Sequence, residues 1–156
     1  MKFHEMVFTI QIDHQVIGGF MNSIDRSTYR DARKKLLILK QLLTNHFLVE
    51  EFVLYPFIRK KINSGERVGP IGRFDDDTAE WLREMEKQES ACTTILALLS
   101  DCLNCEESAF RGMFAKAVTL IEERIHFEEI WLLSGVDTSK TRLLRKSDFA
   151  RLRIEE

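Results

Sequence analysis

The sequence predicts an all-α fold, an up-and-down four-helix bundle with a short C-terminal helical extension. Four long stretches carry apolar residues at steps of three and four, and no strand-like alternation of comparable length occurs in the 156 residues. The chain contains only seven Gly and two Pro, too few for the many turns of an all-β fold. Long helices joined by short links are what such a bundle requires.

The first two helices are expected at residues 3–22 and 29–62. In the first, apolar residues and one histidine, His14, follow one another in alternating steps of four and three. The segment SIDRST interrupts this pattern and supplies Asp25, Ser27 and Thr28 as turn and N-cap candidates before the second helix. Pro56 should bend the second helix or end its regular part.

The second half of the chain is expected to add two helices, at residues 79–103 and 106–133. The segment NSGERVGPIG before them holds three Gly and one Pro in ten residues, which predicts a loop. The acidic run DDDT offers an N-cap and a negatively charged first turn to the third helix. Gly135 is expected to close the fourth.

These helices should form one domain, residues 1–136, followed by a basic amphipathic tail, residues 137–156. A chain of 156 residues is long enough to bury its own core. The tail mixes apolar residues with six Lys and Arg, which predicts a short fifth helix packed across the bundle.

Composition excludes several classes of protein. The 23 Lys and Arg nearly balance the 25 Asp and Glu, and this balance argues against general nucleic-acid binding. No apolar run approaches the ~18–20 residues of a membrane span. Three cysteines form no disulfide framework and favour a reducing cytoplasm. Phosphate loops and nucleophile elbows are absent from the sequence, which argues against a conventional hydrolase or transferase.

Several polar residues fall inside the apolar arcs when each helix is drawn as a wheel at about 100° per residue. They are His14, His46, Glu50, Glu89 and Glu128. Gln88 lies beside Glu89, while His126 and Arg124 fall on the two shoulders of the fourth arc. Burying such groups is costly unless they are paired or bind a metal. Mixed nitrogen and oxygen ligands from four helices favour iron or manganese.

At these residues the chain resembles the hemerythrin-like, HHE cation-binding family. Those bundles carry an isolated His on the first helix and an H-x-x-x-E motif on the second, running into an L-[FY]-P ending. Here IDHQVIGGF supplies His14, and NHFLVEEFVLYP supplies His46, Glu50 and the LYP ending. The resemblance implies a bundle over about residues 3–134. It also implies one or two non-haem iron ions, with a role in sensing, carrying or storing O₂, nitric oxide or iron.

The second half departs from the family pattern. The third helix has no histidine, and Gln88 or Glu89 stands nearest that slot. In ERIHFEEIWLLSG, Glu128 fits the carboxylate slot, but Arg124 occupies the histidine position. By resemblance, His14 and His46 would ligate one metal, Glu50 and Glu128 would bridge or cap it, and Glu89 or His126 would serve a second position.

Three further alternatives stay open at this point. Arg124 could supply the positive charge that a metal supplies elsewhere and pair with Glu50 and Glu128. The chain would then be a metal-free regulatory or scaffold bundle that binds a protein partner or forms a homodimer. A cation other than iron, or an iron-dependent peroxidase-like activity, completes the set of alternatives.

Overall fold

The computed structural model describes residues 2–65 and 74–132, and within these two ranges the chain consists of helices joined by short turns and contains no strand. The α-helices are α1 (Phe3–Asp25), α2 (Tyr29–Val49), α3 (Tyr55–Asn63), α4 (Phe74–Asn104) and α5 (Glu107–Phe127). Two π-helical segments, η1 (Glu50–Leu54) and η2 (Glu128–Leu132), continue α2 and α5. Because η1 joins α2 to α3 without a break, the described helices form four rods. The predicted all-α bundle is confirmed.

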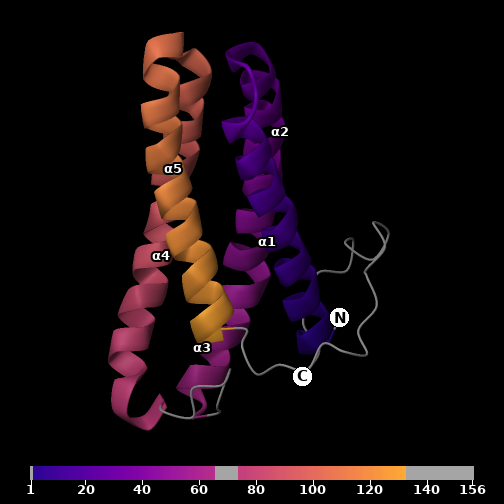
Figure 1. The fold of residues 1–156 in the computed structure, drawn as a ribbon. Helices are drawn as coiled ribbons and strands as arrows, with labels where there is room; N and C mark the ends of the chain where they lie inside the picture. The colour runs from indigo at the N-terminus through magenta and orange to yellow at the C-terminus, as the bar shows by residue number, and fades with distance from the viewer. Residues whose placement is uncertain (1, 66–73, 133–156) are drawn as a thin grey trace.

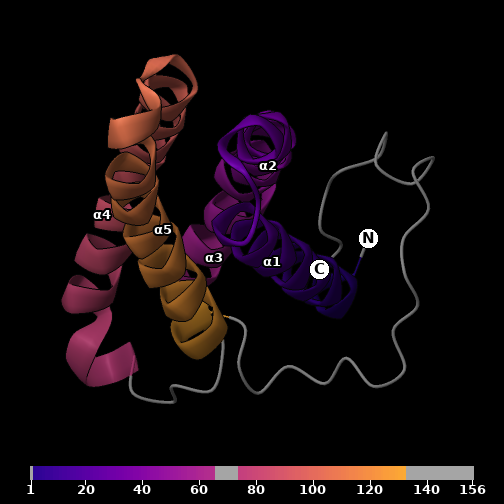
Figure 2. The ribbon, with the colours of Figure 1, turned by 45° about the horizontal axis from the view of Figure 1, so that its top comes forward.

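The four rods form two antiparallel pairs that face each other. α1 packs against α2, and α4 packs against α5 (Figures 1 and 2). Contacts between α2 and α4 and between α1 and α5 join the pairs. The α1–α2 turn and the α4–α5 turn lie at the same end of the molecule, at the top of Figure 1.

Local signals account for the helix starts. Thr28 accepts a hydrogen bond from the Asp31 backbone N–H at 3.4 Å and caps α2, as predicted. The carboxylate of Glu5 accepts from the Lys2 backbone N–H at the start of α1. α4 begins at Phe74, earlier than predicted, so the DDDT run lies inside the first turns of the helix, where negative charge is favourable. The predicted tail, residues 137–156, lies outside the described residues.

Both π segments interrupt regular α geometry at corresponding places. In η1 the chain takes five residues for a widened turn, and the Tyr55 backbone N–H donates to the Glu50 carbonyl, five residues back. Pro56 follows one residue later and has no N–H to donate to the helix. The irregularity expected at this proline therefore takes the form of a widened turn just before it. Each of the two π segments starts at a glutamate, Glu50 in η1 and Glu128 in η2.

The core divides into two apolar clusters. The larger fills the half of the bundle near the helix turns and includes Ile17, Leu39, Leu43, Phe114 and Ile121. The smaller fills the other half and includes Ile10, Leu54, Tyr55, Met85 and Phe127. On each rod a buried polar residue lies between the two clusters: His14, Glu50, Gln88 or Arg124. No helix in the described part of the chain is long and apolar enough to cross a membrane.

Candidate metal centre

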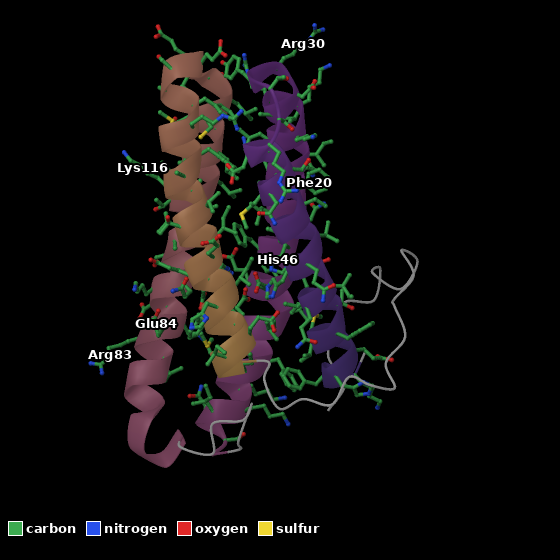
Figure 3. The ribbon with its side chains drawn as sticks, viewed as in Figure 1. Phe20, Arg30, His46, Arg83, Glu84 and Lys116 are labelled. Carbon is green, nitrogen blue, oxygen red and sulfur yellow. The ribbon has the colours of Figure 1, made fainter. Side chains whose placement is uncertain are left out.

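A buried polar layer separates the two apolar clusters at mid-height of the bundle, where Figure 3 shows His46 between the helix pairs. Its members are His14 of α1, His46 of α2, Glu50 of η1, Gln88 of α4, Arg124 of α5 and Glu128 of η2. Each replaces an apolar side chain in a helical repeat that is otherwise apolar, because each falls on the inward face of its rod. Polar groups at this depth need partners.

Four of these side chains converge on one point. His14, His46, Glu50 and Glu128 each offer one ligand atom, and the four atoms lie within 4.8 Å of one another. His46 Nε2 lies 3.0 Å from Glu50 Oε1, and His14 Nε2 lies 3.3 Å from Glu128 Oε1. Ligands at about 2.0–2.2 Å from a common ion are roughly 3–4 Å apart. Both separations therefore suit a shared metal ion.

Two further carboxylates hold the histidine rings from behind. Glu129 Oε1 lies 2.6 Å from His14 Nδ1, and Asp13 Oδ2 lies 3.2 Å from His46 Nδ1. An ionised carboxylate only accepts hydrogen bonds, so Nδ1 is the donor in both rings. The lone pair on Nε2 is then left for the interior. Metal-binding histidines are commonly held in this way.

One oxygen of Glu50 lacks a hydrogen-bond partner. Among the described residues, Glu50 Oε2 is the buried side-chain oxygen without one. His46 Nε2 lies 3.0 Å from Glu50 Oε1 and pairs with it when the ring is protonated. An unsatisfied buried polar atom typically costs about 1–3 kcal/mol. A cation beside Glu50 would satisfy Oε2 and would take the place of the proton on His46 Nε2.

Arg124 contacts the same two glutamates as the histidines. Its Nη2 and Nε donate to Glu50 Oε1 at 3.2 and 3.4 Å, and its Nε lies 3.9 Å from Glu128 Oε1. Its Nη1 donates to the Gln88 backbone carbonyl at 2.5 Å. The guanidinium lies over the Phe47 ring, 4.5 Å from its centroid. These contacts hold a permanent positive charge against the carboxylates.

The charges in the layer shift each other's protonation. Burial lowers the pKa of His46, but the charge of Glu50 and the hydrogen bond to Asp13 outweigh burial and raise it to about 9. Burial raises the pKa of Glu50, but the charges of His46 and Arg124 outweigh burial and lower it to about 2. In the metal-free protein, a protonated His46 therefore balances part of the negative charge of Glu50.

Two residues that the sequence suggested as ligands lie away from the group. Glu89 is partly exposed and pairs with Arg59 of α3. His126 is exposed on α5. On α4 the buried polar residue is Gln88, so the predicted inward face of this helix is shifted by one residue. His14, His46, Glu50 and Glu128 are the predicted residues that the fold brings together.

The sequence did not predict that Asp13 and Glu129 would hold the histidine rings. Asp13 directly precedes His14 but contacts His46 on the neighbouring helix, and Glu129 follows Glu128 but contacts His14. Acidic residues adjacent to ligand candidates were the available signal. Their partners depend on how the helices pack, and a wheel of one helix does not contain that information.

The cysteines do not build a second site within the described residues. Cys92, Cys102 and Cys105 are all free. Cys92 accepts a hydrogen bond from Arg124, and Cys102 is buried in the larger apolar cluster. Burial raises the pKa of both thiols to about 11, which keeps them protonated.

Comparison with known proteins adds no relative. No protein-family model matches the chain, and neither a curated protein nor a solved structure matches it significantly. Function must therefore be argued from the site itself.

Proposed function

We propose that this chain is a hemerythrin-like protein whose bundle core binds non-haem iron or a related divalent cation. The ligands would be His14, His46, Glu50 and Glu128. One observation carries the proposal: two carboxylates turn the Nε2 atoms of two buried histidines toward two buried glutamates. The motif His46-x-x-x-Glu50 with its LYP ending, and His14 on the first helix, support the family assignment.

The donor set fits such an ion. Two imidazole nitrogens and two carboxylate oxygens are a borderline combination that suits iron, manganese or zinc. Glu50 Oε2, a buried oxygen without a hydrogen-bond partner, is the kind of atom that a metal would satisfy. When bound, iron would supply an open coordination position and redox chemistry, as sensing, carrying or storing O₂, nitric oxide or iron requires.

The surrounding residues would control access and orientation. The apolar clusters above and below the layer exclude water and lower the local dielectric, which strengthens the hold of the glutamates on a cation. Asp13 and Glu129 fix the histidine rings, so little side-chain freedom is lost when the ion binds.

Arg124 favours a second candidate function. Its guanidinium already neutralises part of the charge of Glu50, so a bundle without metal would be held together by a buried ion pair. Such a bundle would act as a regulatory or scaffold module that binds a protein partner or a second copy. Leu37, 61% exposed, and Phe52, 71% exposed, are apolar side chains available to that partner.

Metal content distinguishes the two candidates. We would purify the protein without added metal or a chelating tag and measure metals by elemental analysis, before and after anaerobic Fe(II) loading. The metal-binding function predicts a near-stoichiometric ion that survives desalting. His46→Ala should abolish it, because it removes a ligand that two carboxylates orient.

His126→Ala is the matched control, since this exposed histidine lies outside the converging group. It should retain the metal content of the wild type. Absence of metal from the wild type under both conditions would reject the metal function and favour the regulatory bundle. Equal content in His46→Ala and wild type would reject the ligand set.

A further inference from the structure

We infer that the centre takes a single metal ion, because the guanidinium of Arg124 holds the position of a second cation beside the same two carboxylates. The inference rests on the proposed metal function and specifies its stoichiometry. It concerns Arg124 and Gln88, which lie in the polar layer but outside the group of metal ligands.

The first half of the chain, α1 with α2 and η1, and the second half, α4 with α5 and η2, repeat the same local design with different residues. Glu50 and Glu128 each start a π segment, and the buried residue four positions earlier is His46 in one half and Arg124 in the other. The facing helix supplies a buried His14 in the first half and a buried Gln88 in the second. The first half thus offers two imidazoles, and the second offers a guanidinium and an amide.

The two carboxylates lie between these halves and face both. Glu50 Oε1 lies 3.0 Å from His46 Nε2 and 3.2 Å from Arg124 Nη2. Glu128 Oε1 lies 3.3 Å from His14 Nε2 and 3.9 Å from Arg124 Nε. On each glutamate, the oxygen that lies near a histidine is therefore also the oxygen that lies near Arg124. A second metal ion would have to share these two oxygens with the guanidinium.

The guanidinium itself, rather than the net charge, limits the centre to one ion. Glu50, Glu128, Asp13 and Glu129 contribute four negative charges and Arg124 one positive charge, so one divalent ion would leave a net charge of −1 and two would leave +1. The sum does not choose between one ion and two, but the position of the positive charge does. A second ion would have to lie within a few ångströms of a guanidinium that does not lose its proton in proteins. The buried residues of the second half would also offer it no imidazole.

Arg124 is fixed too firmly to give way. Its Nη1 donates to the Gln88 carbonyl and to Cys92 Sγ, and its guanidinium stacks over Phe47 and Tyr55. Moving it aside would break these contacts and leave a buried charge unpaired, which is strongly destabilising.

The test is the number of ions bound by wild type and by a double variant, Gln88→His with Arg124→His. Both proteins are loaded anaerobically with excess Fe(II), desalted and assayed for iron per chain. Iron X-ray absorption then reports whether a second metal lies at roughly 3.5–4 Å. We expect one ion and no metal neighbour in wild type. The double variant, which gives both halves the same ligands, should bind two.

Arg111→His is the control, because Arg111 donates to backbone carbonyls near the α1–α2 turn, about 20 Å along α5 from Arg124. It should bind one ion. Two ions in the wild type would overturn the inference and leave the metal function standing, whereas none would reject both. A folded double variant that still binds one ion would also overturn it. If circular dichroism shows that the variant does not fold, the wild-type ion count and absorption spectrum decide.

Discussion

The carboxylate that holds Nδ1 of each buried histidine is the residue-scale feature that makes this polar layer a candidate metal site. A buried imidazole can turn either nitrogen inward, and its ring can rotate. Asp13 and Glu129 remove that freedom by accepting from Nδ1 of His46 and His14. For Glu129 the hydrogen bond with His14 is also the main reason why its pKa is lowered. Glu129 therefore stays ionised and able to accept at neutral pH.

Asp13→Asn should weaken metal binding by about 10–100-fold while the fold is kept. The amide can still contact His46, but it holds no negative charge and can present its N–H₂ group instead of an oxygen. His46 is then less basic and less firmly oriented. The measurement is the Fe(II) or Zn(II) dissociation constant by competition with a chromophoric chelator.

Asp101→Asn, an exposed change on α4, serves as the control and should leave affinity unchanged. Equal affinities for Asp13→Asn and wild type would mean that the Asp13 carboxylate does not orient the ligand. Asp13 is 46% exposed at its side chain, so the substitution should cost little stability by itself.

At the scale of elements, the π segments are features that helical periodicity did not predict. A wheel at about 100° per residue assumes a regular helix, and it correctly brought His46 and Glu50 to one face. Past Glu50 the buried positions are Leu54, Tyr55 and Ile58, because the widened turn inserts one residue into the repeat. Pro56 was the local signal for an irregularity there, but a proline alone does not distinguish a bend from a π turn.

Deletion of Phe52 should convert η1 into regular α-helix and cost roughly 3 kcal/mol. Phe52 is 71% exposed, so little packing is lost. The cost arises because Pro56 would then lie inside an unbroken α-helix, where its ring opposes the carbonyl four residues earlier. Adding Pro56→Ala to the deletion should recover most of the loss. Urea unfolding of the metal-free proteins measures both values.

The comparison between the two deletion variants is internally controlled, since both lack the same side chain. If they unfold at the same urea concentration, the π turn does not exist to accommodate Pro56. In that case the position of Glu50 in the metal site would be the remaining reason for the widened turn.

For the whole molecule, the sequence was sufficient for the class of fold and for four members of the polar layer. Long apolar repeats with few Gly and Pro predict a helical bundle because little else can bury such faces. Glu89 was placed inward instead of Gln88 because adjacent residues differ by only about 100° on the wheel. The pairing of Arg59 with Glu89 depends on the packing of α3 beside α4, which no single helix reveals.

The metal-free protein should be most stable between about pH 4.5 and 6.5. The pKa of His46 is raised from 6.5 to about 9, so its contribution is complete below pH 6.5 and is lost as the pH rises through 9. The pKa of Glu50 is lowered from 4.5 to about 2, so its contribution is complete above pH 4.5 and is lost as the pH falls through 2. Urea unfolding of chelator-treated protein at a series of pH values measures this profile.

A bound ion should reverse the alkaline side of the profile. Metal binding needs neutral His46, so protons compete with the ion below pH 9, and the stabilisation by metal should grow from pH 6.5 to 9. His46→Gln is the control: without a titrating ring, the metal-free stability should stay nearly level across this range. If chelated wild type and His46→Gln lose stability in parallel above pH 6.5, the charge on His46 does not help to hold the metal-free layer together. Arg124 alone would then balance the two glutamates.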